Sequence, residues 1–283
     1  MKKLTLAAIL LIFFNTSFLN SGGLNPDILK IALLPDENAS RIIKKHIKFK
    51  NYLESEIGKK IELLVTADYS SMVEAIRFKR VHIGYFGPLS YTIAKSKTDI
   101  IPFAVREKNG KTTYNSIIIG NKSLNIQKVS DIKDMNFGYG DVASTSSHLI
   151  PKKILNDFGL KEKTDYKSVF LGAHDAVAIS VQNGNVAAGG LSLPIYQILK
   201  KKKIIDKKKI NEIIISKDYP QYPWVYINEL DETLKKKIQE AFINLKDEEI
   251  LKQLSSSSFK YAIDSDYNII RELSIELSIY DFQ

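Results

Sequence analysis

The feature that most constrains the fold is a repeated alternation of short apolar runs with longer helical patterns. The alternation begins at residues 28–34, an apolar run closed by Pro35, and continues with helical apolar spacing over residues 39–57. It restarts at residues 136–139, where a short strand pattern precedes a second series of helices and strands. Strands that are apolar almost throughout are typical of parallel sheets covered by helices on both faces. The sequence therefore predicts an α/β fold with two similar lobes.

Two lobes also agree with the chain length, because 283 residues are enough for two compact units of ordinary size. We expect the chain to pass between the lobes near Gly120 and to return near Tyr222. Lobe 1 then comprises residues 23–119 and 223–283, and lobe 2 comprises residues 120–222. Two crossing segments make a hinge, and loops at the carboxyl ends of strands converge in the cleft between such lobes.

Residues 1–22 have the plan of a secretory signal peptide, in which Lys2 and Lys3 precede an apolar run and then small and polar residues. The apolar run, residues 4–14, is too short to cross a membrane comfortably as a helix. We expect cleavage near Ser21 and a mature protein in the periplasm. The absence of cysteine excludes disulfides, thiolate metal sites and the lipid-modified cysteine that anchors many exported binding proteins.

The formal charge of +9 raises the question of nucleic-acid binding. Lysine is spread along the whole chain, and its densest run, residues 200–209, contains no aromatic residue. Nucleic-acid surfaces usually gather basic residues on one face with aromatic stacking partners. We therefore interpret the run as a solvated turn and expect no nucleic-acid partner.

The most informative segment is a run of hydroxyl residues between a predicted strand and a helix that begins at about Ser146. The first N–H groups of a helix have no intrahelical acceptor, and the helix dipole makes that end partly positive. Ordinary N-capping needs one Ser or Thr, whereas this segment supplies four in succession, Ser144, Thr145, Ser146 and Ser147. The run therefore predicts a site for a tetrahedral oxyanion.

Two further segments also stand at strand-to-helix junctions. His174 could donate an N–H group to an anion across the cleft, and Asp175 could orient the imidazole or cap the helix. A lone histidine there is more often structural, but its placement in the same lobe as the serine run favours a binding role. In lobe 1, Tyr85 ends a strand before a Gly-Pro turn, and Tyr91 follows on the first helical turn. We expect Tyr85, and Tyr91 if it points inward, to reach the cleft.

Taken together, these segments resemble the phosphate/phosphite/phosphonate-binding family of ABC-transporter periplasmic components. The similarity rests on the Tyr-Phe-Gly-Pro turn, the Ser-Thr-Ser helix start followed by Leu-Ile-Pro, and Gly-x-His-Asp-Ala, and it covers about residues 28–250. It implies a type II periplasmic-binding fold with two α/β lobes, a two-strand hinge and an ABC permease as partner. It also implies that Ser144, Thr145, Ser146 and His174 hold the ligand oxygens.

The resemblance further implies an aromatic wall from lobe 1, Tyr85 with Tyr91, that closes over the ligand. Many members of the family carry an acidic residue where this chain has Ala187, which leaves Ser192 as the polar group of that region. We expect a monomer that needs no cofactor or metal.

The choice of anion follows from the same residues. An aminoalkyl phosphonate carries an ammonium group, and residues 189–194 offer no carboxylate to pair with it. Aromatic rings disfavour large substituents, and they would leave the fourth oxygen of orthophosphate poorly paired. We therefore expect phosphite first and methylphosphonate second.

Two alternatives belong to other functional classes. A periplasmic enzyme acting on phosphoryl groups would need a metal or an activated nucleophile, and no His/Asp/Glu cluster has ligand spacing. A ligand-sensing module would have to act through a separate membrane receptor. The sequence favours a binding protein without catalytic activity.

Overall fold

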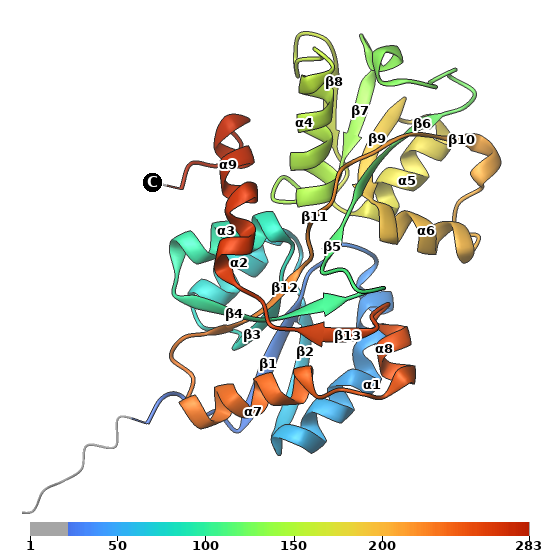
Figure 1. Ribbon diagram of the computed structural model, residues 1–283. Coiled ribbons are helices and arrows are strands. Elements are labelled where there is room, and N and C mark those ends of the chain that lie inside the picture. The colour runs from blue at the N-terminus through green and yellow to red at the C-terminus, as the bar shows by residue number, and fades with distance from the viewer. Residues whose placement is uncertain (1–21, 283) are drawn as a thin grey trace, which may run out of the picture.

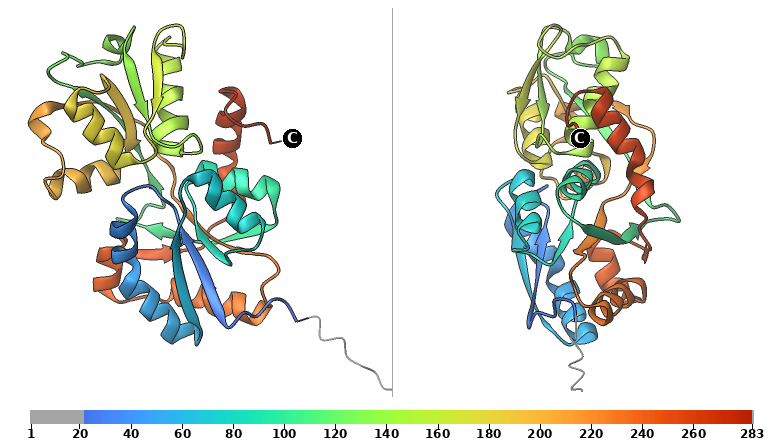
Figure 2. Two further views of the ribbon diagram at one scale, coloured as in Figure 1. Left: turned by 180° about the vertical axis from the view of Figure 1, so that it is seen from behind. Right: turned by 90° about the vertical axis from the view of Figure 1, so that its left-hand side faces the viewer.

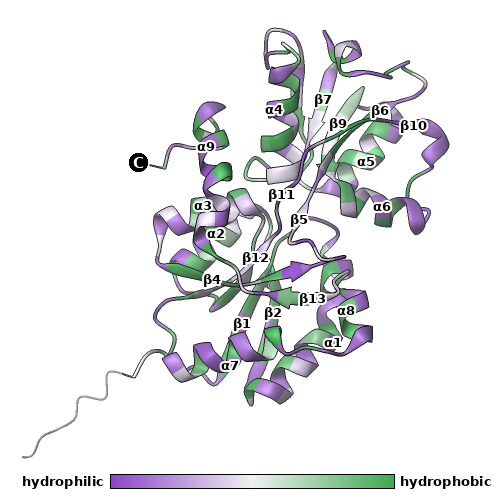
Figure 3. Cartoon of the chain, in the orientation of Figure 1, coloured by the Kyte–Doolittle hydropathy of each residue, from purple (hydrophilic) through white to green (hydrophobic). Residues whose placement is uncertain are grey.

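The computed structural model describes residues 22–282, which form two α/β lobes joined by two extended segments (Figure 1). The predicted signal peptide therefore lies almost entirely outside the described residues. No helix in the described part of the chain is long and apolar enough to cross a bilayer. Figure 3 shows helices striped with hydrophilic and hydrophobic residues, the pattern expected where one helix face packs on a sheet.

Lobe 1 is built on a mixed six-stranded sheet. In spatial order its strands are β13 (Ser258–Lys260), β4 (Ile100–Glu107), β12 (Pro223–Ile227), β3 (Ile83–Tyr85), β1 (Ile28–Leu33) and β2 (Lys60–Val65). β1 pairs in parallel with β2 and β3, whereas β12 runs antiparallel to both β3 and β4. The expectation of a wholly parallel sheet is therefore wrong for this lobe, because β12 enters the sheet from the hinge in the opposite direction.

Helices cover the sheet of lobe 1. They are α1 (Ala39–Ile57), α2 (Tyr69–Arg77), α3 (Pro88–Lys97), α7 (Glu232–Ile243), α8 (Glu248–Gln253), η4 (Asp264–Tyr267) and α9 (Asn268–Glu276). The buried positions of α1 recur every three or four residues, at Ile42, His46, Phe49, Leu53 and Ile57. Asn38 caps its first turn, and Gly58, at φ 74°, ends it in the left-handed conformation that glycine adopts without strain.

Lobe 2 contains a five-stranded sheet. In spatial order its strands are β10 (Ile210–Ile215), β6 (Ser116–Asn121), β9 (Ala188–Ser192), β7 (Asn136–Tyr139) and β8 (Lys167–Phe170). Its helical segments are η1 (Val129–Ile132), the π-helical turn η2 (Thr145–Leu149), α4 (Ile150–Asp157), α5 (His174–Asn183), α6 (Leu193–Lys201) and η3 (Lys207–Lys209). β7 lies parallel to β8 and β9, so the loops that follow these strands meet at one edge of the sheet.

The hinge is an antiparallel pair of two short strands, β5 (Thr113–Tyr114) and β11 (Tyr219–Pro220). The first crossing thus precedes β6, and residues 116–119, assigned to lobe 1 from the sequence, pair within the second sheet. Gly120 marks no linker, because a Cβ atom there would approach the side chain of Ile126 to 2.7 Å. The close packing of Ile126 against β6 therefore explains why a glycine occupies position 120.

The C-terminal helix α9 links the lobes on one side of the molecule. It packs against α3 of lobe 1 and reaches η2 of lobe 2 (Figures 1 and 2). Lys153 of α4 and Glu276 of α9 form an ion pair at 3.4 Å. The described conformation is therefore one in which the two lobes are in contact.

Candidate functional site

The run of hydroxyl residues stands where β7 ends and η2 begins, beside the cleft. Ser144 is the N-cap of η2, and its hydroxyl oxygen accepts a hydrogen bond from the Ser147 amide at 3.2 Å. The amides of Thr145 and Ser146 open the helical turn, where N–H groups have no intrahelical acceptor. The helix thus begins at Thr145, one residue earlier than predicted. Its first turn, η2, is π-helical and leads directly into α4.

The remaining hydroxyls of the run divide into paired and unpaired groups. Thr145 Oγ1 accepts a hydrogen bond from the Leu89 amide at 2.8 Å, and the Ser147 hydroxyl donates to the carbonyl of Gly190. Ser146 Oγ is buried and has no hydrogen-bond partner in the described part of the chain. A buried polar atom without a partner is costly, so this hydroxyl requires a ligand or water to satisfy it.

His174 supplies a second unpaired donor. It is 1 % exposed at the start of α5, and its Nδ1 atom accepts a hydrogen bond from the Ser192 amide at 3.1 Å. The neutral ring therefore carries its proton on Nε2, which is buried and unpartnered among the described residues. Burial lowers the pKa of His174 to about 3, so the imidazole is neutral at physiological pH.

Two tyrosines complete this set of donors. The hydroxyls of Tyr85 and Tyr114 are buried and have no partner among the described residues. Burial raises the pKa of each phenol, so both remain protonated. The Tyr114 hydroxyl lies near those of Ser146, Thr145 and Tyr222, each of which acts on its pKa in the opposite direction.

Tyr222 joins the two tyrosines into one aromatic group. Its ring centroid lies 5.5 Å from that of Tyr85 and 5.2 Å from that of Tyr114. Sequence reasoning noted the Tyr/Pro-rich loop that contains Tyr222 but gave it no binding role, and it missed Tyr114 altogether. Their position on or beside the hinge strands could have indicated a place at the binding site, because hinge residues border the cleft between the lobes.

A small cavity of about 50 Å³ lies between the lobes. Its lining includes Tyr85, Tyr114, Ser192 and Tyr222, together with the charged residues Asp36, Glu37, Lys45 and Arg106. Because one water needs at least about 10–15 Å³ measured in this way, the cavity has room for roughly four water-sized groups. The closed cleft therefore suits a very small guest.

Asp36 corrects one part of the sequence argument. Residues 189–194 indeed contain no carboxylate, but the structure places Asp36, from the loop after β1, in the wall of the same cavity. The backbone carbonyl of Asp36 also accepts a hydrogen bond from the His174 amide at 3.0 Å. With the neighbouring Glu37, the opposite lobe thus contributes two carboxyl groups to the cleft, which the sequence argument had not placed there.

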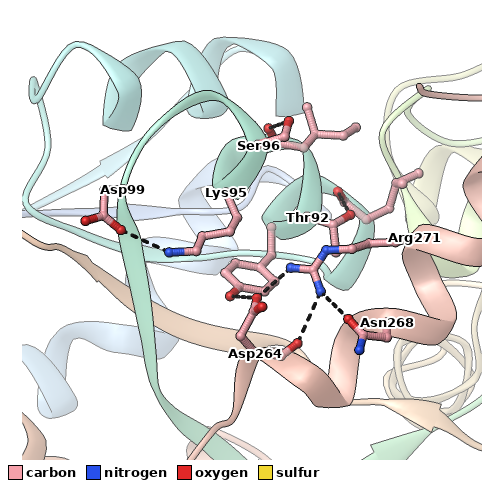
Figure 4. A network of polar contacts seen from close by, with 10 residues as sticks. Thr92, Lys95, Ser96, Asp99, Asp264, Asn268 and Arg271 are labelled. Atoms are coloured by element: carbon pink, nitrogen blue, oxygen red, sulfur yellow. Dashed lines mark hydrogen bonds and ion pairs between the residues drawn. The ribbon is translucent and has the colours of Figure 1, made fainter. Parts of the chain in front are cut away.

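The prediction for Tyr91 is wrong. Its hydroxyl donates to the Asp264 carboxylate at 2.5 Å, and its ring packs on Tyr267 with centroids 4.9 Å apart. Asp264 also pairs with Arg271, which contacts Asn268 (Figure 4). The face of α3 that carries Tyr91 packs on the C-terminal segment, so this tyrosine stabilises lobe 1 and lies away from the cleft.

Asp175 has a different role from either of those expected. Its carboxylate forms an ion pair at 3.3 Å with Arg41 of lobe 1 and accepts a hydrogen bond from the Ala176 amide at 3.0 Å. The backbone amide of Ser192 orients the imidazole of His174 instead. Asp175 therefore joins the lobes, whereas Ser192 lines the cavity, as the sequence suggested, and also fixes the histidine ring.

The arrangement provides neutral hydrogen-bond donors rather than catalytic groups. The neutral unpaired donors beside the open amides of η2 are Ser146 Oγ, Tyr85 Oη, Tyr114 Oη and His174 Nε2. Arg106, which lines the cavity, adds a charged donor, because its Nε is buried and has no partner among the described residues. Preorganised donors of this kind bind an anion, and the cations Lys45 and Arg106 line the same cavity. Among residues 22–282, no group of three His, Cys, Asp or Glu side chains is placed to hold a metal ion.

Comparisons with known proteins agree with this description. Residues 31–267 match the family model described as "ABC transporter, phosphonate, periplasmic substrate-binding protein". The probable ABC transporter phosphite-binding protein PhnD1 of Prochlorococcus marinus is 25% identical over 90% of this chain and 91% of its own length. The phosphonates-binding periplasmic protein of Escherichia coli is 26% identical over 87% of this chain and 76% of its own.

Solved structures show the same fold. PhnD1 in complex with methylphosphonate superimposes with a TM-score of 0.84 at 25% identity, covering 90% of this chain and all of PhnD1. The alkanesulfonate-binding protein SsuA of Xanthomonas axonopodis, bound to MOPS, gives a TM-score of 0.67 at 14% identity, covering 91% and 96% of the two chains. The second likeness concerns the fold alone.

Proposed function

The chain belongs to the family of periplasmic substrate-binding proteins of phosphonate ABC transporters, and on that basis we propose that it captures phosphite first and methylphosphonate second. Members of this family bind and deliver a substrate, so the chain is not an enzyme. It works with an ABC transporter in the periplasm. We further propose that it acts as a monomer after cleavage of its signal peptide and delivers its ligand to the transporter's permease.

One observation carries the proposal: buried, neutral donors without partners gather around the start of η2. In our proposal, Ser144, Thr145, Ser146 and His174 hold the phosphorus oxyanion, and the open amides of η2 assist them. The hydroxyl group of Ser146 and the Nε2–H group of His174 gain hydrogen-bond partners only when an acceptor enters the cleft. Binding therefore removes a cost that the empty closed cleft would otherwise carry.

The size of the cleft supports a compact ligand. A cavity of about 50 Å³ has little room beyond the oxyanion itself. The rings of Tyr85, Tyr114 and Tyr222 lie together at this cavity, and in our proposal their faces adjoin a group at the fourth corner of phosphorus that needs no hydrogen bond, while the hydroxyls of Tyr85 and Tyr114 donate to the ligand oxygens. Hydrogen in phosphite and methyl in methylphosphonate meet that condition. The similarity to PhnD1, a probable phosphite-binding protein solved in complex with methylphosphonate, supports this choice.

Calorimetric titration of the mature protein tests the proposal. The ligands are phosphite, methylphosphonate, orthophosphate and 2-aminoethylphosphonate, each added to protein freed of bound anions by unfolding and refolding. We expect phosphite to bind most tightly, at about micromolar affinity or better, which corresponds to about 8 kcal/mol. Tighter binding of 2-aminoethylphosphonate would contradict the proposed ligand order, and no binding of any of the four would contradict the proposed site.

A further inference from the structure

Arg106 of β4 brings a fixed positive charge to the cavity between the lobes. Its Nη1 atom donates a hydrogen bond to the carbonyl of Leu254. Its guanidinium carbon lies 5.2 Å from the centroid of the Tyr85 ring, within the range of a cation–π contact. Its Nε is buried without a partner in the described part of the chain. The guanidinium group is therefore held in place by two contacts and still has a donor to offer to a guest.

The carboxyl groups of the same lining offset this charge only in part. Asp36 and Glu37 both line the cavity, yet Arg106 forms an ion pair with neither among residues 22–282. Glu37 pairs instead with Arg41, at 3.3 Å. Burial, with a contribution from Glu37, raises the pKa of Asp36 to about 7, so this carboxyl group keeps its proton for much of the time at neutral pH.

The other titratable groups of the lining add positive charge or none. Burial, with a contribution from Arg106, lowers the pKa of Lys45 to about 8, so this second cation is still charged at neutral pH. Burial lowers the pKa of His46 to about 3, so its imidazole is neutral. The phenols of the three cavity tyrosines remain protonated, because burial raises the pKa of each. The cavity therefore has an excess of positive charge at neutral pH.

A fixed charge and a neutral donor discriminate between anions in different ways. A hydroxyl or imidazole N–H group binds any oxygen acceptor that fits. The attraction of a cation, in contrast, grows in proportion to the charge of the guest. Phosphorus oxyanions reach two negative charges near neutral pH, since the second ionisation of a phosphate ester has a pKa of about 6. Sulfonates carry a single charge, so a cation in this cavity favours the phosphorus compound over a sulfonate of the same shape.

We propose that Arg106 is a specificity-determining residue whose charge selects doubly charged phosphorus oxyanions over singly charged sulfonates. The inference rests on the proposed function and adds to it the charge state of the ligand. Arginine suits this role because a guanidinium group is not deprotonated in proteins. Sulfate also carries two charges, and its exclusion depends on the fourth corner of the ligand, where an oxygen would be poorly paired. Selection by charge matters because an alkanesulfonate-binding protein has the same fold.

Arg106→Gln tests the inference, because it removes the charge and keeps a polar side chain. Methylphosphonate and methanesulfonate form a matched pair of ligands, since each has one methyl group and three oxygens. Calorimetry at pH 7.5 measures methylphosphonate directly and methanesulfonate by displacement. We expect the preference of wild type for methylphosphonate to shrink by about tenfold or more in Arg106→Gln. Arg106→Lys keeps the charge and should retain most of the preference. Arg77→Gln, the same change at an exposed arginine of lobe 1, should retain all of it.

A second measurement removes the ionisation of Asp36, because Arg106 favours the ionised form of that carboxyl group. In Asp36→Asn this side chain is neutral at every pH, and Lys45 keeps its charge below its pKa of about 8. The affinity of Asp36→Asn for phosphite should rise between pH 5.5 and 7.5, as the anion loses its second proton. Its affinity for methanesulfonate should stay constant over the same range.

The outcomes separate charge selection from a structural role. An equal loss of affinity for both ligands in Arg106→Gln would leave Arg106 a structural role only and overturn the inference, as would unchanged affinities for both. A phosphite affinity that does not rise with pH in Asp36→Asn also overturns it, and this measurement does not depend on the folding of an Arg106 variant. Failure of wild type to bind any phosphorus oxyanion would instead contradict the proposed function, so the two failures are distinguishable.

Discussion

The amide of Leu89 in lobe 1 donates a hydrogen bond to the hydroxyl of Thr145 in lobe 2, at 2.8 Å. Leu89 lies in the first turn of α3, whose N-cap is Gly87 and which has no side-chain cap of its own. Thr145 therefore caps a helix of the opposite lobe, and its hydroxyl proton remains available to a bound anion. Closure of the cleft and binding of the ligand thus use the same hydroxyl group.

Thr145→Val tests this double role, because valine keeps the shape and removes the hydroxyl. We expect phosphite affinity to fall by about 1–3 kcal/mol, since both the cap and a ligand contact are lost. Calorimetry measures the affinity, and small-angle X-ray scattering measures closure upon addition of phosphite. Thr145→Ser keeps the hydroxyl and should stay close to wild type. Equal affinity of the valine and serine variants would show that the hydroxyl contributes to neither role.

A second prediction compares two buried histidines. In His174 and in His82 the Nδ1 atom accepts a backbone hydrogen bond, from Ser192 at 3.1 Å and from Lys30 at 3.0 Å. Only His174 has a buried Nε2 without a partner, so His174→Ala should weaken phosphite binding by about 1–3 kcal/mol. His82→Ala should lower thermal stability and leave the affinity unchanged. Similar affinities for both variants would remove His174 from the binding site.

A third prediction compares two tyrosines of lobe 1. Tyr85→Phe removes a hydroxyl that has no protein partner, so we expect weaker ligand binding without loss of stability. Tyr91→Phe removes the hydrogen bond to Asp264, so we expect unfolding to require about 1–3 kcal/mol less and the affinity to stay unchanged. Chemical denaturation and calorimetry on both variants measure the two quantities. The reverse pattern would return Tyr91 to the cleft.

The sequence predicted the features that depend on local order along the chain. The hydroxyl run and His174 each follow a strand and begin a helix, and that local arrangement already exposes amides and side chains at the edge of a sheet. Tyr91 was misplaced because the orientation of α3 depends on the segment 264–276, which packs against it from far along the chain. A turn signal alone does not determine which face of a helix is buried.

The residues that sequence reasoning missed belong to lobe closure. Asp36 and Tyr114 line a cavity that forms where the lobes approach each other. No sequence pattern near either residue predicts its position in that cavity. The direction of β12 was missed for a related reason. A strand that returns through a hinge enters its sheet antiparallel, whereas local hydrophobicity reports only that the strand is buried.

The last prediction concerns stability in acid, because burial lowers the pKa of all four histidines. The values fall from 6.5 to about 3 for His46, about 4 for His148 and about 3 for His174. Below pH 6.5 the unfolded chain therefore binds protons that the folded chain excludes, and the free energy of unfolding falls as the pH falls toward 4.

Asp36 acts in the opposite direction, because its pKa is raised from 3.8 to about 7 and the folded state keeps its proton in this range. Asp141, whose pKa burial also raises, acts in the same direction as Asp36. The four histidines outnumber these two carboxyl groups, and each proton changes stability by about 1.4 kcal/mol per pH unit. Urea denaturation of anion-free protein at intervals from pH 4.5 to 7.5 should show a lower midpoint at each step toward acid. His148→Gln, which cannot take up a proton, should give a shallower dependence, and a midpoint independent of pH would show that the buried histidines titrate alike in both states.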